Sequence, residues 1–215
     1  RRPRPGSSGP PVPPVQGFVP SSPAAAPPPV PTPEPSHLPT PPPAPQRAPA
    51  EQGPPGDLAE QLFDLSMELS GAGDPNDACR RALDLALSLI HCEAGSVLRG
   101  GINDEALTFV AVAGPAARDL LGRRLRFGEG LVGACFDLGI SIQVDNVAED
   151  PRHLSDIDQE TGFRTRGVLC VPVRTQTNFH GALQLLNPEH RFYPWHIDAA
   201  EQIAASLAST LTGAS

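Results

Sequence analysis

The sequence VLCVPVRTQTNFHGALQLL, residues 168–186, decides the fold class. It contains two short apolar runs, Val168–Arg174 and Gly181–Leu186, separated by polar residues. Apolar runs of about four to eight residues that are bounded by turn residues are typical of buried strands. We therefore predict two neighbouring strands joined by a turn at Gln176-Thr177-Asn178.

Further strands are predicted before this pair. The run Ala106–Ala113 reads as a strand with alternating faces, and we expect Leu107, Phe109 and Ala111 on one face and the residues between them on the other. The other predicted strands are Ser96–Arg99, Arg123–Phe127 and Ser141–Val144. Together with the pair at 168–186, they make a sheet of six strands.

Helices are predicted at both ends of this strand region. Leucines at 58, 62, 65 and 69 form one apolar stripe, which predicts a helix over Asp57–Gly71. Asp74-Pro75 starts a second helix, because aspartate caps helices and proline fits their first turn. The other predicted helices are Leu131–Leu138 between Gly128-Glu129-Gly130 and Gly139, a short one around Ser155–Gln159, and a last one from Pro194. This order predicts an α+β fold: an antiparallel sheet with the terminal helices packed on one face.

Proline divides the chain into two unequal parts. Of the 28 prolines, 22 lie in residues 1–56, and proline can neither donate a backbone hydrogen bond nor continue a helix. This segment also holds few large apolar residues, too few to offset the entropy lost on ordering it. We therefore expect a disordered proline-rich linker at 1–56 and one folded domain at 57–215.

Charge and cysteine content argue against several function classes. Residues 57–215 carry 12 arginines and 22 acidic residues, so a nucleic-acid backbone is a poor partner. No apolar run approaches the roughly 18 residues of a membrane span. The four cysteines form no CxxC pair, which suits a reducing cytoplasm. The sequence has no metal-binding spacing, phosphate loop or catalytic triad pattern, so we expect no metal, no cofactor and no enzyme activity.

Five segments follow one another in a characteristic order: FGEGLVG (127–133), DNVAEDPR (145–152), DQETGFRTR (158–166), GVLCVPV (167–173) and GALQLLN (181–187). Together they resemble GAF domains, in particular the cyclic-nucleotide-binding GAF domains of phosphodiesterases and their bacterial relatives. The resemblance covers roughly residues 57–211. It implies a six-stranded antiparallel sheet with the terminal helices on one face and a ligand pocket on the other. It also implies signal transduction by sensing a small molecule, such as a cyclic nucleotide, and a homodimer formed through the terminal helices.

The resemblance also implies a set of pocket residues. Glycines at 128, 130 and 133 let the backbone approach a small molecule closely, and the helix that follows would offer unpaired amides to an anion such as a cyclic phosphate. Asp158, Thr161 and Thr165 would read a base edge or a ribose; alternatively, they would only cap a short helix and close a turn. The expected ligand-binding residues are Ser96, Leu131, Val132, Asp158, Thr161, Thr165 and Gln184.

Departures from the family pattern leave the ligand open. Cyclic-nucleotide-binding GAF domains carry an Asn-Lys…Phe…Asp-Glu signature, of which Asn187 and Phe192 are present. Pro188 replaces the lysine, and His196-Ile197 replaces the acidic pair. Leu154 replaces a pocket tyrosine. The alternative function is therefore a GAF scaffold that has lost its ligand and acts through dimerisation.

A third hypothesis is a free methionine sulfoxide reductase, an activity found in some stand-alone GAF domains. These enzymes use a cysteine thiolate in the pocket helix, at the position of Val132. Cys135 lies one turn later and Cys170 lies in an apolar strand. Neither cysteine has a neighbouring cation in the sequence that would lower its pKa, so we favour a domain without catalysis.

Overall fold

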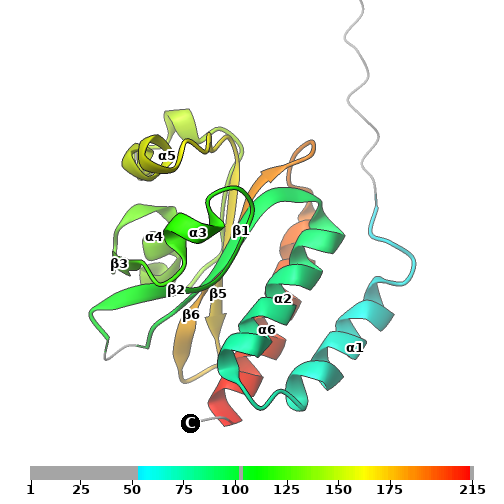
Figure 1. The fold of residues 1–215 in the computed structure, drawn as a ribbon. Coiled ribbons are helices and arrows are strands. Elements are labelled where there is room, and N and C mark those ends of the chain that lie inside the picture. Colours follow the sequence, from blue (N-terminus) through cyan, green and yellow to red (C-terminus); the bar gives the residue numbers. More distant parts are fainter. Residues whose placement is uncertain (1–52, 102–103, 214–215) are drawn as a thin grey trace, which may run out of the picture. The chain divides into compact units, whose positions relative to one another are not determined.

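The structure, a computed structural model, describes residues 53–101 and 104–213 of the chain (Figure 1). The predicted proline-rich linker, residues 1–56, lies outside the described residues except for 53–56. None of the helices in the described ranges is both long and apolar enough to cross a membrane.

Six strands form one sheet in the order β3-β2-β1-β6-β5-β4, and every neighbouring pair is antiparallel. The pair predicted at 168–186 is the hairpin of β5 and β6, which pairs Leu169 with Leu185. β1 begins four residues earlier than predicted, because Cys92 and Ala94 pair with the end of β6. The strands are β1 (Cys92–Arg99), β2 (Ala106–Ala113), β3 (Arg124–Arg126), β4 (Ile142–Val144), β5 (Val168–Arg174) and β6 (Phe179–Pro188).

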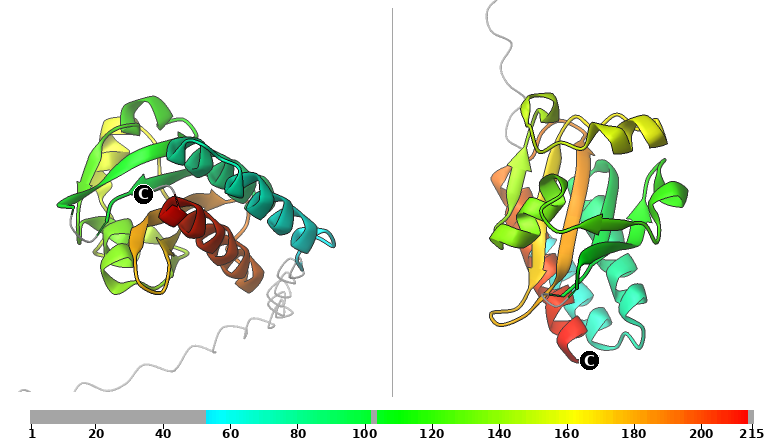
Figure 2. Two further views of the ribbon diagram at one scale, coloured as in Figure 1. Left: turned by 90° about the horizontal axis from the view of Figure 1, so that it is seen from below. Right: turned by 90° about the vertical axis from the view of Figure 1, so that its left-hand side faces the viewer.

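The terminal helices lie together on one face of the sheet, as predicted (Figures 1 and 2). They are α1 (Leu58–Ser70), α2 (Pro75–Ile90) and α6 (Pro194–Gly213). The short helices lie on the other side of the sheet: α3 (Ala117–Leu120), α4 (Gly130–Leu138), the 3-10 turn η1 (Val147–Glu149) and α5 (Ser155–Thr161). α3 has no counterpart among the predicted helices, since four residues are too few to show a helical period.

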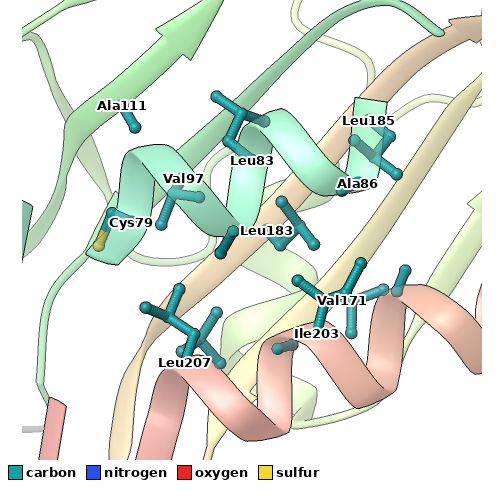
Figure 3. Close-up of a cluster of buried hydrophobic side chains, with 14 of the residues drawn as sticks. Cys79, Leu83, Ala86, Val97, Ala111, Val171, Leu183, Leu185, Ile203 and Leu207 are labelled. Carbon is teal, nitrogen blue, oxygen red and sulfur yellow. The ribbon is translucent and has the colours of Figure 1, made fainter. Parts of the chain in front are cut away.

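The main hydrophobic core fills the space between the sheet and the terminal helices (Figure 3). Leu83 of α2 and Ile203 and Leu207 of α6 point toward Val97 and Leu183 of the sheet, and all five are at most 1% exposed. Each such side chain stabilises the fold by about 2 kcal/mol. The leucine stripe of α1 also packs against this core, so these leucines are used within the chain.

The alternation predicted for β2 is wrong at Ala111. Leu98 pairs with Phe109 whereas Val97 pairs with Ala111, so β2 has one extra residue, Val110, at this point. Such a β-bulge shifts the alternation of side chains by one residue. Leu107 and Phe109 therefore contact the apolar cluster beside the short helices, but Ala111 belongs to the core beside the terminal helices.

Gly181 in β6 is required by the close approach of β1. Its φ is +148°, and a Cβ added there would lie 1.8 Å from the Leu98 carbonyl oxygen. Gly122 also has a positive φ, +82°, but nothing lies within 4 Å of its added Cβ. Comparing alanine substitutions at these two glycines therefore separates the cost of backbone strain from the cost of steric overlap.

We expect Gly181→Ala to destabilise the domain by roughly 3 kcal/mol or more, because strain and overlap add. Gly122→Ala should lower the free energy of unfolding by only about 1–2 kcal/mol, from strain alone. Urea unfolding of both variants measures the difference. Equal losses would contradict the contact between Gly181 and Leu98.

The start of α6 is capped by a histidine. His196 Nδ1 accepts a hydrogen bond from the Tyr193 backbone N–H at 3.2 Å. In a capping box, a glutamate or glutamine three residues after the N-cap usually supplies this acceptor. His196 is 6% exposed, and its burial lowers its pKa from 6.5 to about 4.

We expect this histidine to make stability depend on pH. The fold lowers the pKa of His196 from its ordinary value of 6.5 to about 4. The contribution of His196 to the free energy of unfolding is therefore complete above pH 6.5 and is lost as the pH falls toward 4. His196→Gln keeps an acceptor that does not titrate. Between about pH 7.5 and pH 4.5, the free energy of unfolding should fall more in the natural chain than in this variant. Equal falls would show that His196 plays no part.

Candidate functional site

A cavity of about 80 Å³ lies on the face of the sheet opposite the terminal helices. Its walls come from β1, β2, β6 and the short helices, and most of its lining side chains are apolar. All seven residues predicted from the resemblance line it: Ser96, Leu131, Val132, Asp158, Thr161, Thr165 and Gln184. The fold thus brings residues that are far apart in the sequence to one place.

Two of these residues form a polar pair on the sheet. Ser96 of β1 and Gln184 of β6 are paired across the strands, and Ser96 Oγ donates a hydrogen bond to Gln184 Oε1 at 3.2 Å. Their sequence neighbours, Val97 and Leu183, face the terminal helices. Strand alternation therefore directs Ser96 and Gln184 toward the cavity.

The start of α4 forms another wall. Leu131 and Val132 lie in its first turn and are both 4% exposed. Gly130 has a φ of +70°, and a Cβ there would lie 2.9 Å from Leu154 Cδ1, so only glycine lets Leu154 pack against the helix start. The N-cap residue, Glu129, makes no capping hydrogen bond. The first amides of α4 thus have no side-chain acceptor from their cap.

Asp158 of α5 holds the segment that follows this helix. Its carboxylate accepts hydrogen bonds from the Thr165 backbone N–H and the Thr165 hydroxyl, both at 2.7 Å. His153 Nε2 lies 3.4 Å from Asp158 Oδ2. Asp158 and Thr165 therefore satisfy each other, which matches the predicted alternative of closing a turn.

Thr161 also serves the local backbone. Its hydroxyl donates to the Ile157 carbonyl at 2.7 Å and accepts from the Phe163 N–H at 3.3 Å. It thereby ends α5, as the capping alternative predicts. Thr161 nevertheless lines the cavity together with Asp158 and Thr165.

Residues 154–165, here called the α5 segment, form the wall of the cavity that lies opposite the sheet. Small-molecule pockets usually measure about 300–1,000 Å³, so a volume of about 80 Å³ admits a larger ligand only if this segment moves. Besides the Asp158 bonds, Arg123 forms an ion pair with Glu160 at 2.5 Å. Both side chains are exposed, and such pairs contribute only about 0–1 kcal/mol. The segment therefore has few polar contacts that hold it in place, beside the packing of its apolar side chains Leu154, Ile157 and Phe163.

Asn187 fixes the return of the chain from α5 to β5. Its Oδ1 accepts from the backbone N–H groups of Arg166 at 2.6 Å and Gly167 at 3.3 Å. Its Nδ2 donates to Glu93 Oε2 at 2.8 Å and to the Arg164 carbonyl at 2.9 Å. Arg166 also pairs with Glu93 at 2.7 Å. This network anchors the segment that carries Thr165, without the lysine and acidic pair of the family signature.

Several cavity residues were not identified from the sequence as ligand-binding. Phe109 is predicted only as part of a strand face, but it lines the cavity together with Val112, His153, Ile157 and Phe163. The β-bulge sends Val112 to this side, and no sequence pattern announces it. The cavity lining in the described residues contains one carboxylate, Asp158, and no arginine.

The cysteines near the cavity are poor nucleophiles. Cys135 and Cys170 are 0% exposed. Burial raises the pKa of Cys135 to about 12 and raises the pKa of Cys170 well above its ordinary value. A nucleophilic cysteine needs the thiolate form. In the described part of the chain, no group of three histidine, cysteine or acidic side chains is placed to hold a metal ion.

Comparison with known proteins places these features in a family. A family model of the GAF domain matches residues 74–211. The chain is 24% identical over 143 residues to the cGMP-specific 3',5'-cyclic phosphodiesterase of Drosophila ananassae, covering 61% of this chain and 12% of that protein. A probable 3',5'-cyclic phosphodiesterase of Caenorhabditis elegans, pde-5, is 30% identical over 64 residues, covering 30% of this chain and 9% of that protein. The chain thus spans about a tenth of the length of these relatives.

Solved structures share the same fold. The GAF domain of a phosphoenolpyruvate-protein phosphotransferase from Coxiella burnetii has a TM-score of 0.66 at 20% identity, covering 74% of this chain and 94% of that chain. The free methionine-R-sulfoxide reductase from Neisseria meningitidis has a TM-score of 0.61 at 17% identity, covering 73% and 89%. At these identities the likeness shows the fold alone. The match of the family model over residues 74–211, together with this fold, shows that the chain belongs to the GAF domain family of regulatory, signal-sensing domains.

Proposed function

We propose that residues 57–215 form a sensor that binds a small organic molecule in the cavity beneath α5, and that this molecule is a cyclic nucleotide or a related compound. The observation that carries the proposal is the meeting of seven predicted side chains at one largely apolar cavity. A few convergent polar groups in an apolar pocket are typical of small-molecule sites.

The polar groups suit a ligand with hydrogen-bond donors. The Asp158 carboxylate accepts two hydrogen bonds from Thr165, and a base edge with two N–H groups would offer it equivalent donors. Ser96 and Gln184 provide a second polar point on the sheet. The start of α4 would attract a phosphate through its unpaired amides, which matters because no arginine is among the described residues lining the cavity.

We infer that the domain has a regulatory role without catalysis. The raised pKa values of Cys135 and Cys170 argue against the thiolate chemistry of a methionine sulfoxide reductase. The four free cysteines suit the reducing cytoplasm that we propose as its location. Nothing in the acidic charge balance favours nucleic acid as a partner.

A second proposal is a homodimer through the terminal helices. The predicted leucine stripe of α1 packs against the core of its own chain, so other residues would have to form the interface. Phe63 and Met67 of α1 are 64% and 61% exposed. Beside them, a groove between α1 and α6 is lined only by small residues, among them Ser66, Ala205 and Ser209. Large apolar side chains of one copy would fit the small-residue groove of the other.

Calorimetry with cyclic AMP and cyclic GMP tests the sensor proposal. We expect saturable binding to the full chain, and Asp158→Ala should weaken it by about tenfold or more, because the donors of the ligand would be buried without an acceptor, at about 1–3 kcal/mol each. Asp156→Ala, in an exposed position of the same helix, is the matched control and should bind normally.

Two negative outcomes of the calorimetry would have different meanings. No heat at millimolar concentrations of either nucleotide would exclude cyclic nucleotides as ligands. Binding that Asp158→Ala leaves unchanged would instead show that the ligand occupies another place. Circular dichroism of both variants confirms that each is folded.

Light scattering after size-exclusion chromatography tests the dimer. We expect the natural chain to elute as a dimer and the double variant Phe63→Ser, Met67→Ser as a monomer, because the apolar contact across the interface is lost. Leu138→Ser, which removes a 61% exposed leucine elsewhere, should remain dimeric. A monomeric natural chain would contradict the proposal.

A further inference from the structure

A second cavity, here called the sheet-end pocket, lies where β4 and β6 end and β5 begins. Its volume is about 200 Å³, and none of its lining residues also lines the cavity beneath α5. Its base is formed by Gly167, Asn187 and Pro188, and its rim carries Asp145, Arg166, His190 and Arg191.

The base of the sheet-end pocket is not polar enough to bind a ligand by itself. Gly167 has no side chain, and Pro188 is buried and has no backbone N–H. The side-chain amide of Asn187 already makes hydrogen bonds to Arg166, Gly167, Glu93 and Arg164. Recognition of a ligand therefore falls to the charged rim.

The rim holds two guanidinium groups whose positions are fixed by neighbours. Arg166 is bound to Glu93 through two N–H groups at 2.7 and 3.4 Å. The Arg191 guanidinium carbon lies 5.1 Å from the centre of the Tyr193 ring, a cation–π contact. A guanidinium has five N–H donors, so Arg166 keeps donors beyond those that face Glu93. Fixed positions reduce the entropy lost on binding.

Among the residues that line the sheet-end pocket, arginines outnumber carboxylates, and Glu93 beside the pocket pairs with one of these arginines. Two arginines and His190 line the pocket with one carboxylate, Asp145. That carboxylate already accepts a hydrogen bond from Gln143 Nε2 at 2.8 Å. The excess of arginine is local, because residues 57–215 hold 12 arginines and 22 acidic residues in all. Guanidinium groups bind carboxylate and phosphate oxygens through paired, charge-assisted hydrogen bonds.

We propose that the sheet-end pocket is a binding site for the oxyanion group of a small molecule, a phosphate or a carboxylate, held between Arg166 and Arg191. Glu93 competes with this anion for Arg166. The site is independent of whether a ligand binds beneath α5, since the two cavities share no lining residue.

Amide chemical-shift titrations of the full chain test the site, with sodium phosphate and sodium malonate as probes and sodium chloride of equal ionic strength as control. We expect saturable shifts at the amides of Gly167, His190 and Arg191. Arg191→Gln should weaken binding by about tenfold or more, because a charge-assisted hydrogen bond is lost. Arg118→Gln, an exposed position on α3, should change nothing.

Glu93→Gln should change the affinity for the anion in the opposite direction to Arg191→Gln, which distinguishes a specific site from general electrostatic attraction. It removes the competing charge on Arg166 but keeps an oxygen that can accept from Asn187, so we expect tighter binding by a few fold. Saturation with phosphate alone or malonate alone identifies the group that is bound. Linear shifts equal to those with chloride, or equal affinity in Arg191→Gln, would overturn the proposal.

Discussion

The buried side chain of Asn187 holds in place a wall of each of the two proposed binding sites. It is 1% exposed and has a φ of +54°, in the left-handed region that asparagine tolerates better than most residues. Its amide holds residues 164–167 against the ends of β1 and β6. Without it, buried backbone donors would lose their acceptors, at about 1–3 kcal/mol each. The segment that it fixes carries Thr165 to one cavity and Arg166 to the other.

The two faces of the sheet are packed differently. Side chains on one face pack against α1, α2 and α6 and form the larger of the two buried clusters. On the other face the covering helices are short, α5 has no buried residue, and the apolar side chains leave a cavity between them. The bulge at Val110 supports this division, because it turns Ala111 toward the core and Val112 toward the cavity.

The sequence predicts the elements well because their patterns are local. Apolar periodicity identifies the strands and long helices, and glycine, proline and aspartate mark their ends, as at Asp74, whose carboxylate accepts from the Asn76 N–H. The resemblance predicts which side chains meet at one cavity. Neither predicts the bulge, the capping role of His196 or the four bonds of Asn187, because these depend on partners that only the folded chain brings close.

In the proposed mode of binding, a ligand beneath α5 replaces hydrogen bonds that the chain already makes. Asp158 accepts both donors of Thr165, so exchanging them for donors of a ligand changes the free energy little. Affinity must then come from apolar surface buried in the cavity, at about 25 cal/mol per Å². Selectivity would come from Asp158, because a ligand that displaced Thr165 without offering donors of its own would leave the carboxylate without these partners. Since Asp158 also holds the segment after α5 through Thr165, a ligand that took the place of Thr165 would also release that segment.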